Sequence, residues 1–346
     1  MAGPPAAVAA IRRAVRASIS DVHHPVRVAC SGGADSVALA AAVSFVSRRE
    51  GYGPVCGLTV DHGLQPDSAE RAQLTAAILT DIGLEPVHIL TVRVGTEGGP
   101  EAAARTARYE ALMRGVQNTG GCVALGHTRD DQAETVLLGL GRGSGPRSIA
   151  GMRTYQGIWW RPFLDIPRAT TEKACQALGL PIWDDPHNHD PAYRRVRLRQ
   201  EVLPLLDDVL GGGTSAALAR TAALLRDDLD ALDTLAAQWQ TDHHATGEIL
   251  PAVGLAELPP ALRQRVLRLW LIGRSVPELG SVHLAEVGRM ITDWHGQGPL
   301  DLPGGFSLSR TSGTLTLKSG TPRGRASHQA AATSPRNSPT HQPREP

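Results

Sequence analysis

The most specific chemical signal in the sequence is the hexapeptide Ser31-Gly32-Gly33-Ala34-Asp35-Ser36, between an apolar run and a helical pattern. Its two glycines let the chain turn tightly and approach an anion, and the amides that open a helix favour negative charge. Ser31 and Ser36 add hydroxyl donors, whereas Asp35 would repel a phosphate unless Mg²⁺ lies between them. The hexapeptide therefore predicts a phosphate site with Mg²⁺ at Asp35. The alternative is a glycine turn whose serine and aspartate cap a helix.

A second group of polar side chains combines His127 with Asp130, Asp131 and Glu134. The three carboxylates fall within about one helical turn and repel one another unless they meet a cation, either a metal ion or an ammonium group. As plain helix chemistry, acids in a first turn would only complement the helix dipole. The group predicts a cation site if it faces another functional element.

Alternating strand-like and helix-like segments position these two groups. Apolar runs at 26–30, 55–60, 86–94 and 122–125 are each followed by a helical pattern, which after the second run covers 68–82. Farther along, an apolar run predicts a strand at 158–164, and Pro191 opens a helical pattern that runs toward Pro204. Such alternation predicts right-handed crossovers and a doubly wound parallel α/β sheet. The hexapeptide and the acidic group follow strands that should be neighbours, across the topological switch where such folds bind ligands.

The hexapeptide resembles the pyrophosphate loop (PP-loop) of the N-type ATP pyrophosphatases, a Rossmann-like superfamily. The run from Gly126 to Gly145 is more specific and resembles the tRNA(Ile)-lysidine synthetase family. The resemblance extends over about residues 26–206, through segments at 61–64 (DHGL), 104–109 (ARTARY), 161–164 (RPFL), 183–188 (WDDPHN), 194–197 (RRVR) and 203–206 (LPLL). Two residues depart from the family pattern: His187 stands where serine is usual, and Arg195 where asparagine is usual.

The resemblance implies a ligase that adenylates the wobble cytidine of the isoleucine tRNA with a CAU anticodon. The ε-amine of free lysine then displaces AMP, giving lysidine and changing decoding from Met to Ile. ATP would bind at the loop residues Ser31, Gly32, Gly33, Ala34, Asp35 and Ser36, with Mg²⁺ at Asp35. The catalytic set would be Asp35, His127, Asp130, Asp131 and Glu134, with the roles of the last three not assigned individually.

Arginines supply the local positive charge that tRNA requires. The whole chain has 35 basic and 34 acidic residues, a net charge of +1, and gives no global attraction to a polyanion. Arg194, Arg195, Arg197 and Arg199 form a dense basic cluster. We expect tRNA contacts from Arg105 and Arg108 and, within this cluster, from Arg194, Arg195 and Arg197. An arginine-rich helix can also be a solvated face, and some of these residues could pair with acids instead.

A glycine run at 211–213 predicts a domain boundary. We expect a catalytic domain at 1–210 and a smaller, mainly helical tRNA-binding domain at 214–320, with helices near 214–239, 261–272 and 282–294 and a hairpin at 300–317. Residues 321–346 are rich in Pro, Ser, Arg and Gln, which predicts a disordered tail. No apolar run is long enough to span a bilayer, so we expect no membrane partner and a cytoplasmic location.

Other functions compete with this interpretation. A 2-thiocytidine type tRNA thiolase shares the fold but carries paired cysteines, whereas the four cysteines here are widely spaced. Another adenylating ligase, such as GMP or NAD synthetase, would not explain the 126–145 run. A catalytically idle RNA-binding module would not need an intact loop at 31–36. The oligomeric state stays open, with a homodimer among the alternatives.

Overall fold

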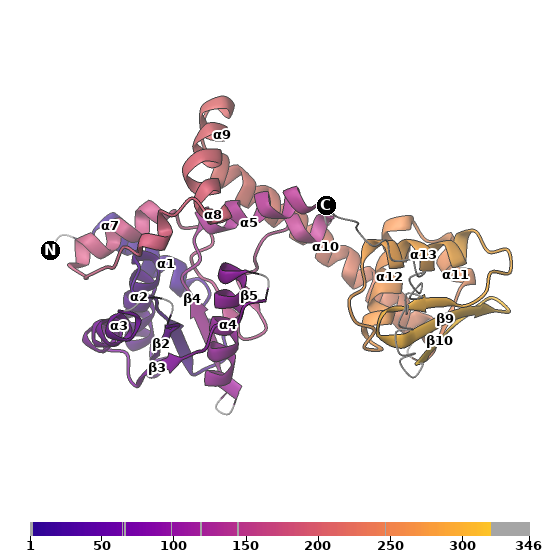
Figure 1. The fold of residues 1–346 in the computed structure, drawn as a ribbon, viewed down its shortest axis with the longest axis horizontal. Coiled ribbons are helices and arrows are strands. Elements are labelled where there is room, and N and C mark those ends of the chain that lie inside the picture. The colour runs from indigo at the N-terminus through magenta and orange to yellow at the C-terminus, as the bar shows by residue number, and fades with distance from the viewer. Residues whose placement is uncertain are drawn as a thin grey trace, which may run out of the picture. The chain divides into compact units, whose positions relative to one another are not determined.

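Figure 1 shows the computed structural model, which describes residues 3–63, 65, 67–97, 99–117, 120–143, 145–245 and 247–319. The chain divides into two compact units, Met1–Leu229 and Asp230–Pro346. This division falls inside helix α10 (Thr214–Asp242), beyond the glycine run at 211–213. The proposed tail at 321–346 lies outside the described residues. Within the described ranges, no helix is sufficiently long and apolar to traverse a bilayer.

The first unit is built on a six-stranded sheet in the order β3-β2-β1-β4-β6-β5. All neighbouring strands are parallel except β5, which runs antiparallel to β6. The strands are β1 (Val26–Ala29), β2 (Cys56–Asp61), β3 (Val87–Thr91), β4 (Cys122–Leu125), β5 (Tyr155–Gln156) and β6 (Trp159–Trp160). The helices before α10 are α1 (Ala6–Arg16), α2 (Ala34–Glu50), α3 (Ser68–Ile82), α4 (Pro100–Gln117), α5 (Arg129–Arg142), α6 (Pro146–Ile149), α7 (Arg168–Leu178), α8 (Arg194–Arg197) and α9 (Leu203–Leu210).

Helices cover both faces of this sheet, which confirms the predicted doubly wound α/β class. Successive residues of a strand point to opposite faces, so β4 contributes to two cores. Cys122 and Ala124 pack in the cluster that contains helices α1, α2 and α7. Val123 and Leu125 pack on the other side with Leu112 of α4. Burial on both faces is why these strands read as continuous apolar runs.

The order of the central strands determines where the topological switch of the sheet lies. Strands β1 and β4 pair in parallel, from Val26 opposite Cys122 to Ala29 opposite Leu125. The chain leaves β1 toward β2 on one side and β4 continues the sheet on the other, so the topological switch lies between them. The loop at 31–36 and the segment at 126–134 therefore begin side by side, as predicted.

Two local expectations after residue 150 were wrong in extent. The strand expected at 158–164 is limited to β6, because Pro162 carries no amide hydrogen for a ladder. The helix expected between Pro191 and Pro204 begins at Arg194 and continues through α9 to Leu210. Residues 198–202 adopt a π-helical turn before Pro204. A wider turn accommodates a proline that cannot make the regular α-helical hydrogen bond.

The second unit combines helices with a small antiparallel sheet. Its elements after α10 are β7 (Ile249–Pro251), α11 (Val253–Glu257), α12 (Pro260–Ile272), α13 (Ser281–Thr292), β8 (Leu300–Leu302), β9 (Phe306–Thr311) and β10 (Thr314–Ser319). Strands β9 and β10 form the expected hairpin, turning at Ser312 and Gly313, which both have positive φ. Strand β7 pairs with β10 and was not anticipated. Trp270 of α12 is buried at the centre of this unit's core.

Candidate active site

The loop at 31–36 turns sharply because of Gly32. Its φ is +86°, and a Cβ there would lie 3.0 Å from Thr75 Oγ1. The Gly32 carbonyl accepts a hydrogen bond of 2.9 Å from the backbone amide of Trp183, which ties the loop to a distant segment. Gly33 has an ordinary φ of −74° and caps the N-terminus of α2, where a Cβ would make only ordinary contacts of 3.8 Å and 3.9 Å. The turn therefore requires glycine at position 32. At position 33, the missing side chain leaves the backbone at the start of α2 accessible to a ligand.

The two loop serines have different surroundings. Ser36 is buried, and its hydroxyl donates to the Gly33 carbonyl at 2.9 Å while accepting from the Ser31 amide at 3.2 Å. Ser31 is exposed, and its hydroxyl lies 3.4 Å from that of Ser36. Ser36 therefore shapes the loop, and Ser31 presents its hydroxyl to solvent and to any ligand.

Gly126 allows the segment after β4 to touch the start of α2. A Cβ at this position would lie 2.9 Å from the carbonyl oxygen of Asp35 and 3.0 Å from the amide nitrogen of Ser36. Real Cβ atoms do not approach backbone atoms this closely, so only glycine fits. This contact brings the acidic helix α5 against the loop at 31–36.

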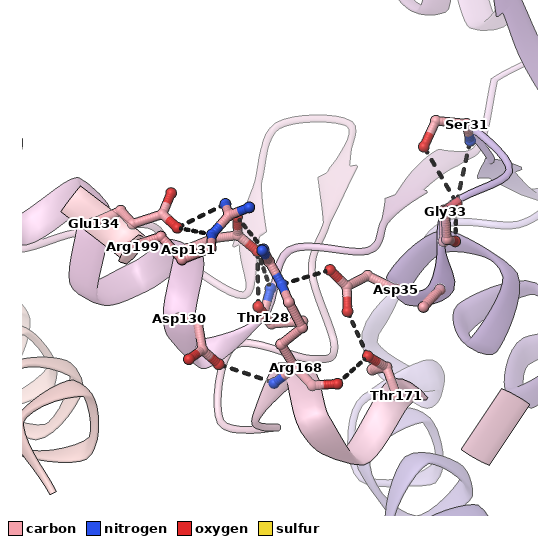
Figure 2. Close-up of polar contacts among 12 residues, drawn as sticks. Ser31, Gly33, Asp35, Thr128, Asp130, Asp131, Glu134, Arg168, Thr171 and Arg199 are labelled. Atoms are coloured by element: carbon pink, nitrogen blue, oxygen red, sulfur yellow. Dashed lines mark hydrogen bonds and ion pairs between the residues drawn. The ribbon is translucent and has the colours of Figure 1, made fainter. Parts of the chain in front are cut away.

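Asp35 points from the first turn of α2 toward α7 (Figure 2). Its carboxylate accepts a hydrogen bond from the Thr171 hydroxyl and forms an ion pair with Arg168, with 3.2 Å between Oδ2 and Nε. Burial raises the pKa of Asp35 to about 6, against the opposing effects of the Arg168 guanidinium and the Thr171 hydroxyl.

Asp131 is fixed from both sides. Its Oδ2 accepts hydrogen bonds of 2.8 Å from the amide and the hydroxyl of Thr128, which caps α5, while Oδ1 lies 3.1 Å from an Arg168 nitrogen. Burial alone would raise the pKa of Asp131, but Arg168, His127 and Thr128 together hold it at about 2. Asp131 is therefore an ionised carboxylate at neutral pH.

The other two acids of α5, Asp130 and Glu134, contact different groups. Asp130 accepts a 2.9 Å hydrogen bond from the backbone amide of Arg168, at the start of α7. Glu134 is fully buried, and its Oε1 lies 2.7 and 2.8 Å from two nitrogens of Arg199 while Oε2 lies 3.3 Å from Arg195. Burial and the neighbouring Asp131 raise the pKa of Glu134, and Arg199 opposes this rise. The cation predicted for the acids is thus provided in part by arginines.

Known proteins resemble this chain over most of its length. A family model described as a PP-loop domain matches residues 7–206, and one described as a TilS substrate binding domain matches residues 250–316. The tRNA(Ile)-lysidine synthase of Thermobifida fusca (strain YX) is 51% identical, over 92% of this chain and 99% of that protein. The corresponding protein of Streptomyces coelicolor is 52% identical over 85% of both chains. The chain belongs to the tRNA(Ile)-lysidine synthase family.

A solved structure has a similar fold. The U34-tRNA thiolase NcsA from Methanococcus maripaludis, with its 4Fe-4S cluster, superposes with a TM-score of 0.53 at 19% identity. The match covers 64% of this chain and 80% of the thiolase. The likeness confirms the PP-loop architecture only. In the described part of this family member, all four cysteines are free thiols, and Cys30, Cys122 and Cys175 are buried.

The arginines of this lysidine synthase family member fall into two groups. Arg195 and Arg199 face Glu134, whereas Arg194 and Arg197 are exposed, and Arg197 pairs with Glu201 at 2.8 Å. This division agrees with the expectation that some of these arginines pair with acids.

The remaining predicted residues lie beside β4 and on α4. The Arg105 guanidinium stacks 4.9 Å from the Tyr109 ring and donates to its hydroxyl at 3.2 Å, and Arg108 lies 5.8 Å from the same ring. Burial lowers the pKa of His127 to about 3, and nearby Arg161 acts in the same direction. The Nδ1 atom of His127 is buried without a hydrogen-bond partner among the described residues. His127 is therefore a neutral ring at physiological pH.

Sequence reasoning missed the residues that connect the two motifs. Arg168 and Thr171 of α7 contact Asp35, and Thr128 contacts Asp131. The only sequence signal for them was the need of clustered acids for a cation, which does not say where that cation comes from. Arg199 belonged to the recognised arginine cluster but was not assigned to the acids.

The donor set fits Mg²⁺ bound together with a nucleotide. No group of three His, Cys, Asp or Glu residues arranged as a metal site occurs in the described ranges. Mg²⁺ that binds through substrate phosphates needs only one or two carboxylates, and keeps several waters. Asp35 offers such a carboxylate next to the loop. Among the described residues, the guanidinium groups of Arg168, Arg195 and Arg199 pair with Asp35, Asp131 and Glu134. Asp130 instead accepts a hydrogen bond from a backbone amide, so its carboxylate can still meet a further cation.

Proposed function

We propose that the protein forms lysidine in the isoleucine tRNA with a CAU anticodon, joining the ε-nitrogen of free lysine to the wobble cytidine at the expense of ATP. Membership of the tRNA(Ile)-lysidine synthase family supports this function over most of the chain. The observation that carries the chemistry is the parallel pairing of β1 with β4. It sets the loop at 31–36 beside the acids of α5, with Arg168 3.2 Å from Asp35 and 3.1 Å from Asp131.

In the first step, the loop would hold the β- and γ-phosphates of ATP. The amides at the start of α2 and the Ser31 hydroxyl suit the negative charge of pyrophosphate, and such preorganised donors are usually the largest catalytic contribution. Asp35 would hold Mg²⁺, which supplies charge neutralisation for the leaving pyrophosphate. The ring carbonyl oxygen of cytidine attacks the α-phosphorus, pyrophosphate leaves, and the base becomes adenylated.

In the second step, the amine of lysine must reach the activated ring carbon. Among the acids of α5, Asp130 is bound by a backbone amide and, in the described residues, by no guanidinium group, so its carboxylate suits an ammonium group. The ε-ammonium group first loses a proton to solvent. The free amine then attacks the ring carbon, and AMP departs with the former carbonyl oxygen. Neutral His127, beside β4, is placed near the reacting groups in this scheme.

We assign tRNA contacts to Arg105, Arg108 and the exposed Arg194 and Arg197, with residues 214–320 as a further tRNA-binding region. The substrate-binding family model at 250–316 supports this assignment. Arg195, through its ion pair with Glu134, would position an acid as well as add positive charge near the tRNA.

The test is turnover with purified components. The full chain, ATP, Mg²⁺, lysine and the CAU-anticodon tRNA should yield AMP, pyrophosphate and lysidine, the last detected by mass spectrometry of the digested tRNA. Sustained pyrophosphate release should need both lysine and that tRNA, and the methionine tRNA should not replace it. Asp35→Asn should abolish turnover without unfolding the protein. Sustained release that is independent of lysine or of the tRNA would refute the proposed function.

A further inference from the structure

Arg168 joins the two halves of the proposed site through both its side chain and its backbone. The guanidinium lies between Asp35 of α2 and Asp131 of α5, and the backbone amide donates to Asp130 at 2.9 Å. The carbonyl of Arg168 accepts a hydrogen bond of 2.6 Å from the Thr171 hydroxyl, which also binds Asp35 (Figure 2). The start of α7 is thus held in place independently of the guanidinium.

The two side-chain contacts of Arg168 are unequal. Toward Asp131, a terminal nitrogen makes a hydrogen bond of 3.1 Å. Toward Asp35, Nε comes within 3.2 Å of Oδ2, yet this buried Nε makes no hydrogen bond of acceptable geometry. A charge contact without hydrogen-bond alignment is the weaker of the two. The contact with Asp35 is therefore the one that a competing cation can replace.

Neither carboxylate would be well accommodated here without a cation. Asp35 and Asp131 repel each other, and burial already opposes ionisation of Asp35. A Mg²⁺ ion on Asp35 and the Arg168 guanidinium would serve the same Oδ2 atom, because Thr171 occupies Oδ1. Two cations cannot both stay at this oxygen without repelling each other.

We propose that Arg168 is a positioning residue that holds Asp35 and Asp131 as a placeholder cation and gives up its contact with Asp35 when Mg²⁺ arrives with the nucleotide. This role rests on the proposed function, because it takes Asp35 as the Mg²⁺ ligand. Arg168 then keeps its hydrogen bond with Asp131, while its anchored backbone preserves the position of α7. Arg168 can therefore keep the two carboxylates together before substrate binds, but it also competes with Mg²⁺ for Asp35.

Calorimetric binding of α,β-methylene-ATP to the full chain, with and without Mg²⁺, tests this competition. The measured quantity is the ratio of the dissociation constant without Mg²⁺ to that with Mg²⁺. In Arg168→Gln the competitor is removed, and this ratio should rise about threefold to fivefold, the worth of a partly exposed ion pair. The matched control Arg16→Gln removes an exposed arginine that pairs with Glu50, and should leave the ratio unchanged.

Two further measurements keep the test decisive if Arg168→Gln folds poorly. Arg168→Lys retains the charge but lacks the planar fork that spans two carboxylates, so its ratio should also rise, by less. In crystals of the wild-type Mg²⁺–nucleotide complex, Arg168 Nε should lie beyond 4 Å, the ion-pair limit, from Asp35 Oδ2. An unchanged or reduced ratio in Arg168→Gln, or in Arg168→Lys if Arg168→Gln does not fold, would overturn the proposal, and so would a retained contact in the crystal. No tRNA or lysine is present, so this result is distinct from failure of lysidine synthesis.

Discussion

Glu134→Gln gives the most direct measure of how strongly the site depends on its buried ion pairs. Glu134 has no exposed side-chain surface, while Arg195 and Arg199 are 28% and 27% exposed. Removing one partner of a fully buried ion pair costs about 3–5 kcal/mol. Because water reaches both guanidinium groups, and because Gln keeps the volume and one acceptor, we expect a loss of about 2 kcal/mol. For a unit of this size, that loss corresponds to a fall in Tm of about 4–8 °C.

Scanning calorimetry is the appropriate assay, because the two units of the chain need not unfold together. The matched control is Glu201→Gln, which removes the same kind of charge from an exposed pair with Arg197, where the side chains are 50% and 61% exposed. That control should leave Tm unchanged within error. If Glu134→Gln shifts the transition no more than Glu201→Gln does, Glu134 is not held by buried ion pairs and the electrostatic description of the site is wrong.

Three other perturbations test separate parts of the structure. The pKa of Asp35 in the folded protein, about 6, lies above its unfolded value of about 3.9, so its contribution favours folding below about pH 4 and is lost as pH rises through 6. Asp35→Asn should remove this loss, up to about 3 kcal/mol, from urea unfolding free energies measured between pH 4 and 7; an equally steep profile in the variant would contradict it. Gly126→Ala would press a Cβ against the backbone of α2, so nucleotide affinity measured by calorimetry should fall at least about tenfold, and wild-type affinity would refute the close contact. Deleting residues 321–346 should leave lysidine formation nearly unchanged in the turnover assay, and a large loss would show that this segment contributes to the reaction.

Much of the first unit could be predicted from local pattern alone. The helix expected at 68–82 matches α3 at both ends, and the run at 122–125 matches β4. Gly83 follows α3 in the left-handed conformation that ends many helices, so the stop signal was local. Strand β7 was missed because three residues carry too little periodicity, and only pairing with β10 makes them a strand.

The residue types of the site were predicted, but the partners of these residues were not. The sequence showed a glycine loop, four carboxyl residues and clustered arginines, together with a resemblance that explained why they occur in one chain. Which arginine meets which acid depends on where α7 and the helix that begins at Arg194 pack. The pairs are separated by 37 residues between Arg168 and Asp131 and by 65 between Arg199 and Glu134.

The amino-acid sequence by itself determined the order of strands and helices, the loop after β1, the acidic turn of α5 and the family. These features are encoded in short-range patterns, where each residue acts on neighbours a few positions away. Only the tertiary structure decided that Arg168 lies between Asp35 and Asp131, that Asp130 turns to the backbone of α7, and that Glu134 is buried beneath two arginines. The physical reason is that burial and ion pairing are set by groups far apart in the chain, which come together only when the helices pack on the sheet.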